Sequence, residues 1–217
     1  ETVLDAGCGS GGVTAQLIER LPNGRVIAVD GSPSMVEKAR ERLGGRADVR
    51  EGDLSELELD EAVDVVFSNA VFHWILDHKR LFERLHAALR PGGRLVAQCG
   101  GIGNVAKLAK ATDAVVAASD FSAHLSEIPQ LWNFAGPEET EARLAAAGFD
   151  SVRCWLEPRP VTPEDPLAFL ATVALGPFLD RLPPDLQDDF VRKVAAEMEQ
   201  PVTLDYVRLN IDAQKPA

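Results

Sequence analysis

The chain has 217 residues, of which 46% are hydrophobic and 26% charged, a composition ordinary for a soluble globular protein with one sizeable core. Its 34 acidic and 22 basic side chains give a net charge of −12, which argues against a nucleic-acid partner, because phosphate binding relies on basic surface. The apolar runs are too short for a membrane span, and three scattered cysteines match neither a disulfide framework nor a zinc site. We therefore expect a cytoplasmic protein without a metal site, for which a monomer is plausible.

Strand and helix patterns alternate along the chain, as in a doubly wound, largely parallel sheet. Strands are predicted at 3–4, 25–30, 48–53, 63–69, 94–98, 151–156 and 204–211. Helices are predicted at 13–20, 33–43, around 81–85, at 104–120, at 137–147, from Thr162-Pro163, and from Pro183-Pro184 to before Pro201, with a turn at 89–93 and a loop at 121–136. The pattern predicts one α/β domain over 1–217, with a core over 1–100 and helical cap-like segments at about 104–136 and 162–200.

The first predicted strand ends in an acid, Asp5, and continues into a glycine-rich turn. Gly7, Gly9 and Gly11 permit positive φ and allow a ligand to approach bare backbone, close to the free N–H groups of the next helix. With Gly12 the turn also satisfies the G-x-G-x-x-G spacing, so an NAD-dependent oxidoreductase and a non-catalytic nucleotide-binding domain remain alternatives. Asp5 favours S-adenosylmethionine, because its carboxylate would repel a pyrophosphate but suits an ammonium group.

Further acids follow the second and third strands. Asp30 stands where a carboxylate accepts the hydroxyl groups of an adenosine ribose, and the alternative is a capping or loop acid. Ser32 is expected to cap the helix that begins at Pro33. Met35 is expected either against an adenine or in the core, and Asp53 either on the adenine amino group or as an ordinary loop acid.

Asn69 and Ala70 end the fourth strand, at the edge of the sheet where ligands of doubly wound folds bind. His73-Trp74 follows and places a titratable imidazole beside a large flat side chain, so His73 is either catalytic or structural. Cys8 is expected to be only a small residue in the glycine turn. Trp132 either lines a substrate pocket or covers the sheet.

Together these segments resemble a class I S-adenosylmethionine-dependent methyltransferase. The resemblance is carried by Asp5 to Gly11, by Asp30, by Gly52-Asp53-Leu54 and by Leu89-Arg90-Pro91-Gly92-Gly93. It implies a Rossmann-like sheet of seven strands with an antiparallel last strand. Phe67 to Trp74 and Leu175 to Leu179 look most like the trans-aconitate methyltransferase group, whose helices before the first strand are absent from this sequence.

This resemblance implies methyl transfer to a small molecule, with O-methylation of a carboxylate as its specific form. The residues expected to bind the cofactor are Asp5, Gly7, Cys8, Gly9, Gly11, Asp30, Ser32, Met35, Asp53, Leu54, Asn69 and Ala70. The residues expected at the substrate are His73, Trp74, Trp132 and Arg208, with His124 as a further candidate cation. His73 would act as a base on a phenol or amine, whereas a carboxylate acceptor is already ionised and needs only positioning.

Overall fold

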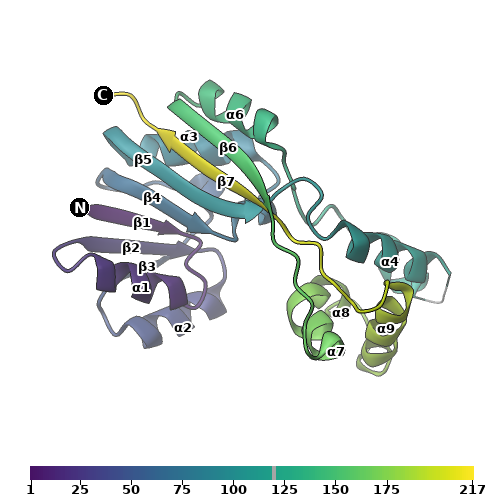
Figure 1. Cartoon of the computed structure of the whole chain (residues 1–217). Coiled ribbons are helices and arrows are strands. Elements are labelled where there is room, and N and C mark those ends of the chain that lie inside the picture. Colours follow the sequence, from purple (N-terminus) through teal and green to yellow (C-terminus); the bar gives the residue numbers. More distant parts are fainter. Residues whose placement is uncertain (119–120) are drawn as a thin grey trace. The chain divides into compact units, whose positions relative to one another are not determined.

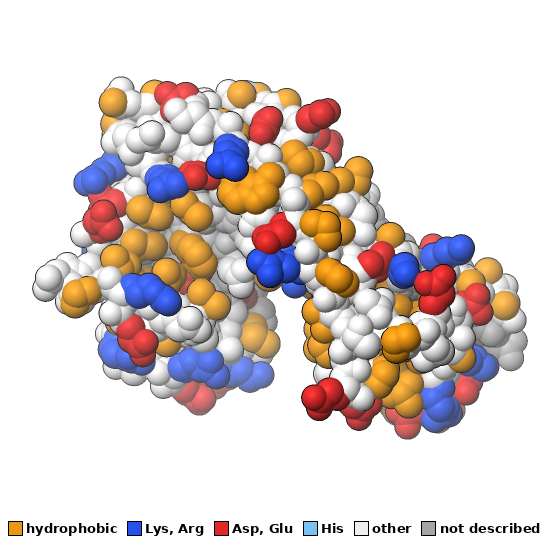
Figure 2. Space-filling model, viewed as in Figure 1, with side chains coloured by type: hydrophobic (Ala, Val, Ile, Leu, Met, Phe, Trp, Pro, Cys, Tyr) orange, Lys and Arg blue, Asp and Glu red, His pale blue; other side chains and the backbone are white. Residues whose placement is uncertain are grey.

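A computed structural model describes residues 1–118 and 121–217 of the chain. The chain divides into two compact units. The first comprises residues 1–102, 132–157 and 208–217, and the second comprises 103–131 and 158–207. The second unit thus contains most of the two segments predicted to be cap-like, whereas 132–136 belongs to the first. On the face of each unit shown in Figure 2, acidic and basic side chains are interspersed.

The first unit is built around a mixed sheet (Figure 1). Its strands are β1 (Thr2–Ala6), β2 (Arg25–Asp30), β3 (Asp48–Glu51), β4 (Val63–Asn69), β5 (Leu89–Gly100), β6 (Asp150–Pro158) and β7 (Val207–Gln214). Its helices are α1 (Gly12–Arg20), α2 (Pro33–Leu43), α3 (His78–Ala88) and α6 (Pro137–Ala146), with the short 3₁₀ turns η1 (Leu54–Glu56) and η2 (Phe72–Trp74).

The seven strands lie in the order β3-β2-β1-β4-β5-β7-β6. The pairs β1–β2, β1–β4, β2–β3 and β4–β5 are parallel, and β7 runs antiparallel to β5. This order and the antiparallel last strand confirm the predicted Rossmann-like fold. Because β1 and β4 are neighbours, the glycine turn after β1 and the polar end of β4 meet at the same edge of the sheet.

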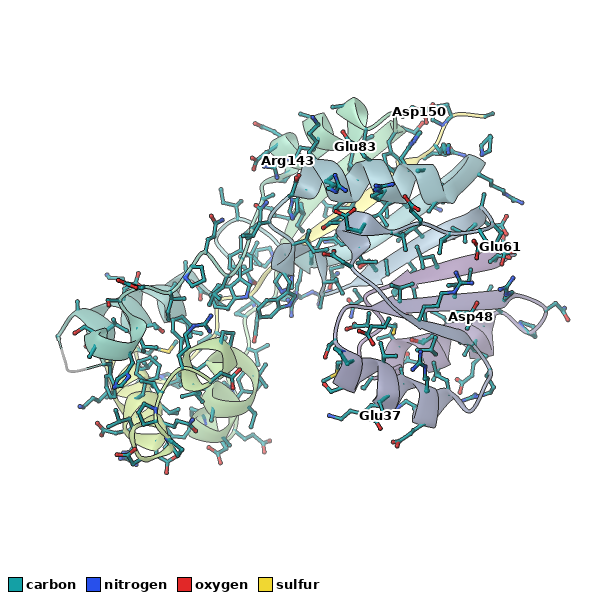
Figure 3. The ribbon with its side chains drawn as sticks, turned by 180° about the vertical axis from the view of Figure 1, so that it is seen from behind. Glu37, Asp48, Glu61, Glu83, Arg143 and Asp150 are labelled. Carbon is teal, nitrogen blue, oxygen red and sulfur yellow. The ribbon has the colours of Figure 1, made fainter. Side chains whose placement is uncertain are left out.

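Alternate side chains of each central strand point to opposite faces of the sheet. Ile27 and Val29 of β2 belong to the larger core cluster, which includes Phe82 of α3 and Leu144 of α6. Ala28, between them in sequence, belongs to a separate cluster with residues of α2. Figure 1 and the reverse view in Figure 3 show the same division, with α1 and α2 on one face and α3 and α6 on the other.

Several element boundaries differ from the prediction. β5 begins at Leu89, inside the predicted turn: Val63 pairs with Leu89 and Val65 with Arg94, so residues 90–93 form an irregularity within the strand. β3 ends at Glu51 rather than at residue 53, because the Asp53 side chain accepts a hydrogen bond from Ser55 N and starts η1. The last strand runs from 207 to 214 instead of 204 to 211.

The second unit is helical. It contains α4 (Ala106–Ala117), α5 (Ser122–Leu125), α7 (Pro166–Phe169), a π-helical turn (Leu170–Ala174), α8 (Gly176–Leu179) and α9 (Pro184–Glu197). The Phe121 and Phe178 rings pack against Phe190 of α9, with centroids 5.0 and 6.2 Å away. Residues 119–120, at the end of the helix predicted over 104–120, lie outside the described residues.

Two predictions within the second unit are wrong. The loop predicted at 121–136 contains α5. The helix expected to be capped by Thr162 begins only at Pro166, because Asp165 accepts the hydrogen bond from Ala168 N at its N-terminus. Val161, just before, instead forms an isolated antiparallel bridge with Leu204, so the last strand does not begin at residue 204 as predicted.

Candidate functional site

The three glycines of the turn after β1 all have positive φ, at 86° for Gly7, 52° for Gly9 and 77° for Gly11. A Cβ on Gly7 would stand 2.1 Å from Val71 Cγ2, and one on Gly11 would stand 3.2 Å from the Leu43 side chain. A Cβ on Gly9 would meet nothing within 4 Å. Packing therefore demands glycine at position 7, and a Cβ at position 11 would need the Leu43 side chain to give by a few tenths of an ångström. Gly9 instead presents bare backbone to open space, as a turn that receives a ligand should.

Asp5 is 2% exposed, and its carboxylate accepts a hydrogen bond of 2.7 Å from the Thr14 hydroxyl. Burial raises its pKa from 3.8 to about 6, the Thr14 hydrogen bond opposes this shift, and the charge of Asp30 adds to it. Above about pH 6 this buried carboxyl group is ionised, and a buried negative charge beside a glycine turn is poorly suited to a diphosphate. It fits a cofactor that brings an ammonium group, as S-adenosylmethionine does.

Asp30 holds two backbone segments together. One carboxylate oxygen accepts from Gly9 N at 2.8 Å, and the other accepts from Ser32 N at 2.9 Å. Each oxygen has a second lone pair, so the carboxylate retains capacity for a ribose hydroxyl. Ser32 precedes α2 as predicted, but its side chain makes no capping hydrogen bond to the helix and instead meets the Ser34 hydroxyl at 3.1 Å.

Four other predicted cofactor residues differ in exposure. Met35 is half-buried, outside the core, and lines an open cavity of about 570 Å³ with Ser10 and the polar side chains of α2. Cys8 is buried, and burial raises the pKa of its thiol to about 12, so it remains protonated. Asp53 is exposed, and one of its carboxylate oxygens accepts a hydrogen bond from Ser55 N. Leu54 is buried in the larger core cluster.

The end of β4 leads directly to the predicted substrate residues. Ala70 has a φ of 61°, which is uncommon for a residue with a Cβ, and its N–H donates to Gln98 O at 2.7 Å. Val71, whose side chain contacts Gly7, comes next and precedes η2. Asn69, Ala70 and η2 are thus brought next to the glycine turn, and strained backbone of this kind is concentrated at functional sites.

His73 is buried in η2 at 8% exposure. Its Nδ1 accepts a hydrogen bond of 3.2 Å from Gly100 N, which leaves Nε2 as the nitrogen that carries the proton. Burial lowers its pKa from 6.5 to about 4, with smaller contributions from Arg208 and His78. Arg208 of β7 pairs with Gly100 of β5, so the structure brings this predicted cation close to His73. His124 is exposed on α5 in the second unit.

His73 belongs to a cluster of four aromatic rings, which we name the aromatic cluster: His73, Trp74, Trp132 and Phe134. Ring centroids are 5.3 Å apart for His73–Trp74, and 5.7 Å apart for Trp74–Trp132, for Trp132–Phe134 and for Phe134–His73. Each ring therefore contacts two others. Trp74 remains 51% exposed.

The residues that hold η2 in place were not predicted from the sequence. His78 is buried at the start of α3, its Nδ1 lies 3.2 Å from Arg143 Nη1, and its Nε2 lies 2.9 Å from Phe72 O. Because arginine only donates, Nδ1 must accept and Nε2 must donate to Phe72 O. Arg143 comes from α6, beside α3 (Figure 3). The distance from residue 78 to 143 in the chain explains why no local pattern could reveal this pair.

Thr14 and Asn133 were missed too. Thr14 could have been noticed, because it lies in the first helix directly after the acid-and-glycine turn that it serves. Asn133 ties the segment between Trp132 and Phe134 to η2: its N–H donates to His73 O at 2.8 Å and its side chain to Leu76 O at 2.9 Å. In the described part of the chain, no group of three or more His, Cys, Asp or Glu side chains is placed to hold a metal ion.

Comparison with known proteins agrees with this geometry. A family model described as "Methyltransferase domain" matches residues 3–93. The trans-aconitate 2-methyltransferase of Variovorax paradoxus is 32% identical over 99% of this chain and 87% of its own length. That of an Azoarcus species is 43% identical, but over 45% of this chain and 38% of its own length.

Among solved structures, phosphoethanolamine N-methyltransferase 2 of Haemonchus contortus superimposes with a TM-score of 0.64 at 23% identity, over 100% of this chain and 49% of that one. This likeness supports the fold. In the part of the chain that the structure describes, no helix has the length and apolarity to cross a membrane. The match over 87% of the Variovorax protein decides against an NAD-dependent oxidoreductase and against a non-catalytic nucleotide-binding domain. The chain belongs to the class I S-adenosylmethionine-dependent methyltransferases, and it is an enzyme that methylates a small molecule.

Proposed function

We propose that this enzyme methylates a carboxylate oxygen of a small organic acid. The observation that carries the proposal is the state of His73, a neutral imidazole with its proton on Nε2 and with Arg208 near it. Such a pair offers the Nε2–H of the imidazole together with the N–H donors and the positive charge of a guanidinium, which suit an acceptor that arrives as an anion. The names of the relatives from Variovorax and Azoarcus support the same class, because trans-aconitate is a carboxylic acid.

The residues around the glycine turn would bind the cofactor. The buried carboxylate of Asp5 would face the ammonium group of S-adenosylmethionine, and the open backbone at Gly9 would lie against its methionine part. Asp30 would accept from the ribose with its remaining lone pairs. Met35 and Asp53 would lie at the adenine, while Asn69 and Ala70 would face the methionine chain through their carbonyl groups. The remaining predicted cofactor residues would shape the backbone around the cofactor: Gly7, Cys8, Gly11, Ser32 and Leu54.

When bound, S-adenosylmethionine would supply an activated methyl group on its sulfonium, with a neutral thioether as the leaving group. No proton has to leave a carboxylate acceptor, so the protein's task is alignment and exclusion of water. His73 would donate from Nε2 to the acceptor oxygen that does not react. Arg208 would hold the carboxylate by charge, and the aromatic cluster would cover it from solvent.

The test is release of S-adenosylhomocysteine from the purified enzyme with matched panels of acids, phenols and amines. We expect release with acids, and formation of the methyl ester in the same amount. An Arg208→Gln variant should raise KM for acids and leave the affinity for S-adenosylhomocysteine unchanged, because Arg208 would contact the acceptor and not the cofactor. Turnover confined to phenols or amines would contradict the carboxylate proposal.

A further inference from the structure

The aromatic cluster is a preformed surface beside the glycine turn. Asn133 fixes the backbone between Trp132 and Phe134 to η2 with its two hydrogen bonds to His73 O and Leu76 O. A third hydrogen bond, from Ile102 N to Ala135 O at 3.0 Å, fixes the end of the same segment. Because the rings are held on both sides, a ligand that stacks on them does not need to order them first.

The cluster also lies next to the place where the methyl donor is proposed to bind. Val71 fills the space that a side chain on Gly7 would need, and the next residue begins η2. His73 and Trp74 are therefore the second and third residues after a contact with the glycine turn. An acceptor that reaches the donor from this side would meet the exposed half of Trp74.

The guanidinium of Arg208 lies beside the cluster and can hold one carboxylate. Arg208 is the cation whose charge lowers the pKa of His73, and His73 adds a single N–H donor. Indole and phenyl faces offer no hydrogen-bond donor, so a second and third carboxylate lying on them would lose hydration without compensation. Flat, unsaturated groups stack favourably on the same faces.

We propose that the acceptor is an acid with one carboxylate on a flat, unsaturated, apolar body, which lies on the aromatic cluster while its carboxylate meets His73 and Arg208. This inference rests on the proposed carboxylate methylation and narrows it. It departs from a tricarboxylate acceptor such as the one named for the Variovorax relative. The apolar body supplies the binding surface, and the single carboxylate supplies the reacting oxygen.

The experiment compares three acids: trans-cinnamate, which has one carboxylate on a flat body; 3-phenylpropionate, which has the same ring and carboxylate on a saturated chain; and trans-aconitate. S-adenosylhomocysteine release gives kcat and KM for each. We expect kcat/KM for trans-cinnamate to exceed that for trans-aconitate by about tenfold or more, with 3-phenylpropionate between them. Saturation-transfer NMR with the wild-type enzyme and S-adenosylhomocysteine should show the cinnamate ring protons in contact with the protein.

Substitutions of Trp74 test the surface itself. Trp74→Ala should raise KM for trans-cinnamate about tenfold with a smaller change in kcat, and Trp74→Phe should restore most of the loss. Trp155→Ala is the matched control, because Trp155 is an exposed tryptophan of β6 that stacks with Arg153 and not with the aromatic cluster. We expect it to leave both constants unchanged.

Two results would overturn the inference and leave the carboxylate proposal standing. One is a preference for trans-aconitate over trans-cinnamate. The other is an equal loss on both acids in Trp74→Ala, which would assign Trp74 a structural role. Release with phenols or amines but with none of the acids would overturn both proposals, so the two failures are distinguishable.

Discussion

The N–H of Gly100 in β5 donates a hydrogen bond of 3.2 Å to Nδ1 of His73 in η2. This contact assigns the tautomer of a buried imidazole, since Nδ1 accepts and the proton must therefore lie on Nε2. It also connects the end of a central strand with the turn that follows β4, its neighbour in the sheet. The imidazole thus presents a donor rather than a basic nitrogen.

A His73→Asn variant should therefore retain part of the activity on a carboxylate acceptor. Because burial lowers the pKa of His73 to about 4, the wild-type kcat should show no step near pH 6.5 from this residue. The measurement is kcat from pH 5.5 to 8.5 for both forms, with the affinity for S-adenosylhomocysteine as the control. Complete loss of activity, together with a wild-type rate that rises steeply through pH 6.5, would indicate base catalysis instead.

The lowered pKa of His73 should also make the folded protein less stable in acid. The unfolded chain binds a proton at pH 6.5 and the folded chain only near pH 4, so stability falls as the pH drops through this window. Over the whole window the loss in unfolding free energy is about 3 kcal/mol. Urea unfolding of the wild type and of His73→Asn at pH 7 and pH 4.5 measures it: the difference in unfolding free energy between the two pH values should be smaller in the variant.

Asp5 should show opposite effects on stability and on cofactor binding. Folding raises its pKa from 3.8 to about 6, so its destabilising contribution appears as the pH rises between these values and reaches about 3 kcal/mol above pH 6. Asp5→Asn should therefore stabilise the ligand-free protein at pH 8 by roughly 1–3 kcal/mol. The same substitution should also weaken the binding of S-adenosylhomocysteine by roughly 1.5–3 kcal/mol, because the charged partner of the ammonium group is lost.

Thr14→Val is the companion variant. Loss of the hydroxyl removes the hydrogen bond that lowers the pKa of Asp5, so the pKa should rise further. Wild-type affinity for S-adenosylhomocysteine, measured by calorimetry from pH 5 to 8, should fall below pH 6. This fall should move to higher pH in Thr14→Val and disappear in Asp5→Asn. Identical pH dependence in all three proteins would refute the proposed role of Asp5.

Substitutions at two glycines of the turn should separate folding from binding. Gly7→Ala would place its Cβ 2.1 Å from Val71 at a φ of 86°, and we expect a loss of roughly 3 kcal/mol or more in unfolding free energy. Gly9→Ala meets no atom within 4 Å, so its loss should be about 1–2 kcal/mol from the left-handed backbone alone. Yet Gly9→Ala should abolish measurable binding of S-adenosylhomocysteine. Retained binding in a folded Gly9→Ala protein would show that no ligand approaches this backbone.

His78 should act on the reaction through η2. His78→Leu leaves Phe72 O and Arg143 without this partner, which we expect to cost roughly 2–4 kcal/mol and to lower kcat. His86→Leu, at the other end of α3, is the control, because His86 contacts Phe149 and not η2. The ¹⁵N shifts of the His73 ring should change in His78→Leu and stay as in the wild type in His86→Leu. Unchanged His73 shifts in both variants would argue that His78 only stabilises the fold.

Much of the fold was predictable because its signals are local. Continuous apolar strands such as 25–30, the proline at the start of α2 and Gly44 at its end each act within a few residues, and β2 and α2 form where these signals place them. The family motifs supplied the antiparallel last strand, which no local pattern reveals. Boundaries failed where a distant partner intervened, as when Leu204 paired with Val161 instead of continuing β7.

The sequence by itself determined the chemistry present at the ends of the strands: an acid before a glycine turn after β1, an acid after β2, and an imidazole beside an indole after β4. Only the tertiary structure decided the state of these groups. The pKa of Asp5 depends on burial, and the tautomer of His73 depends on an N–H that lies 27 residues away. The ring contacts of the aromatic cluster likewise join residues 73–74 to residues 132–134. Burial and long-range hydrogen bonds exist only after the chain has folded, and no spacing in the sequence encodes them.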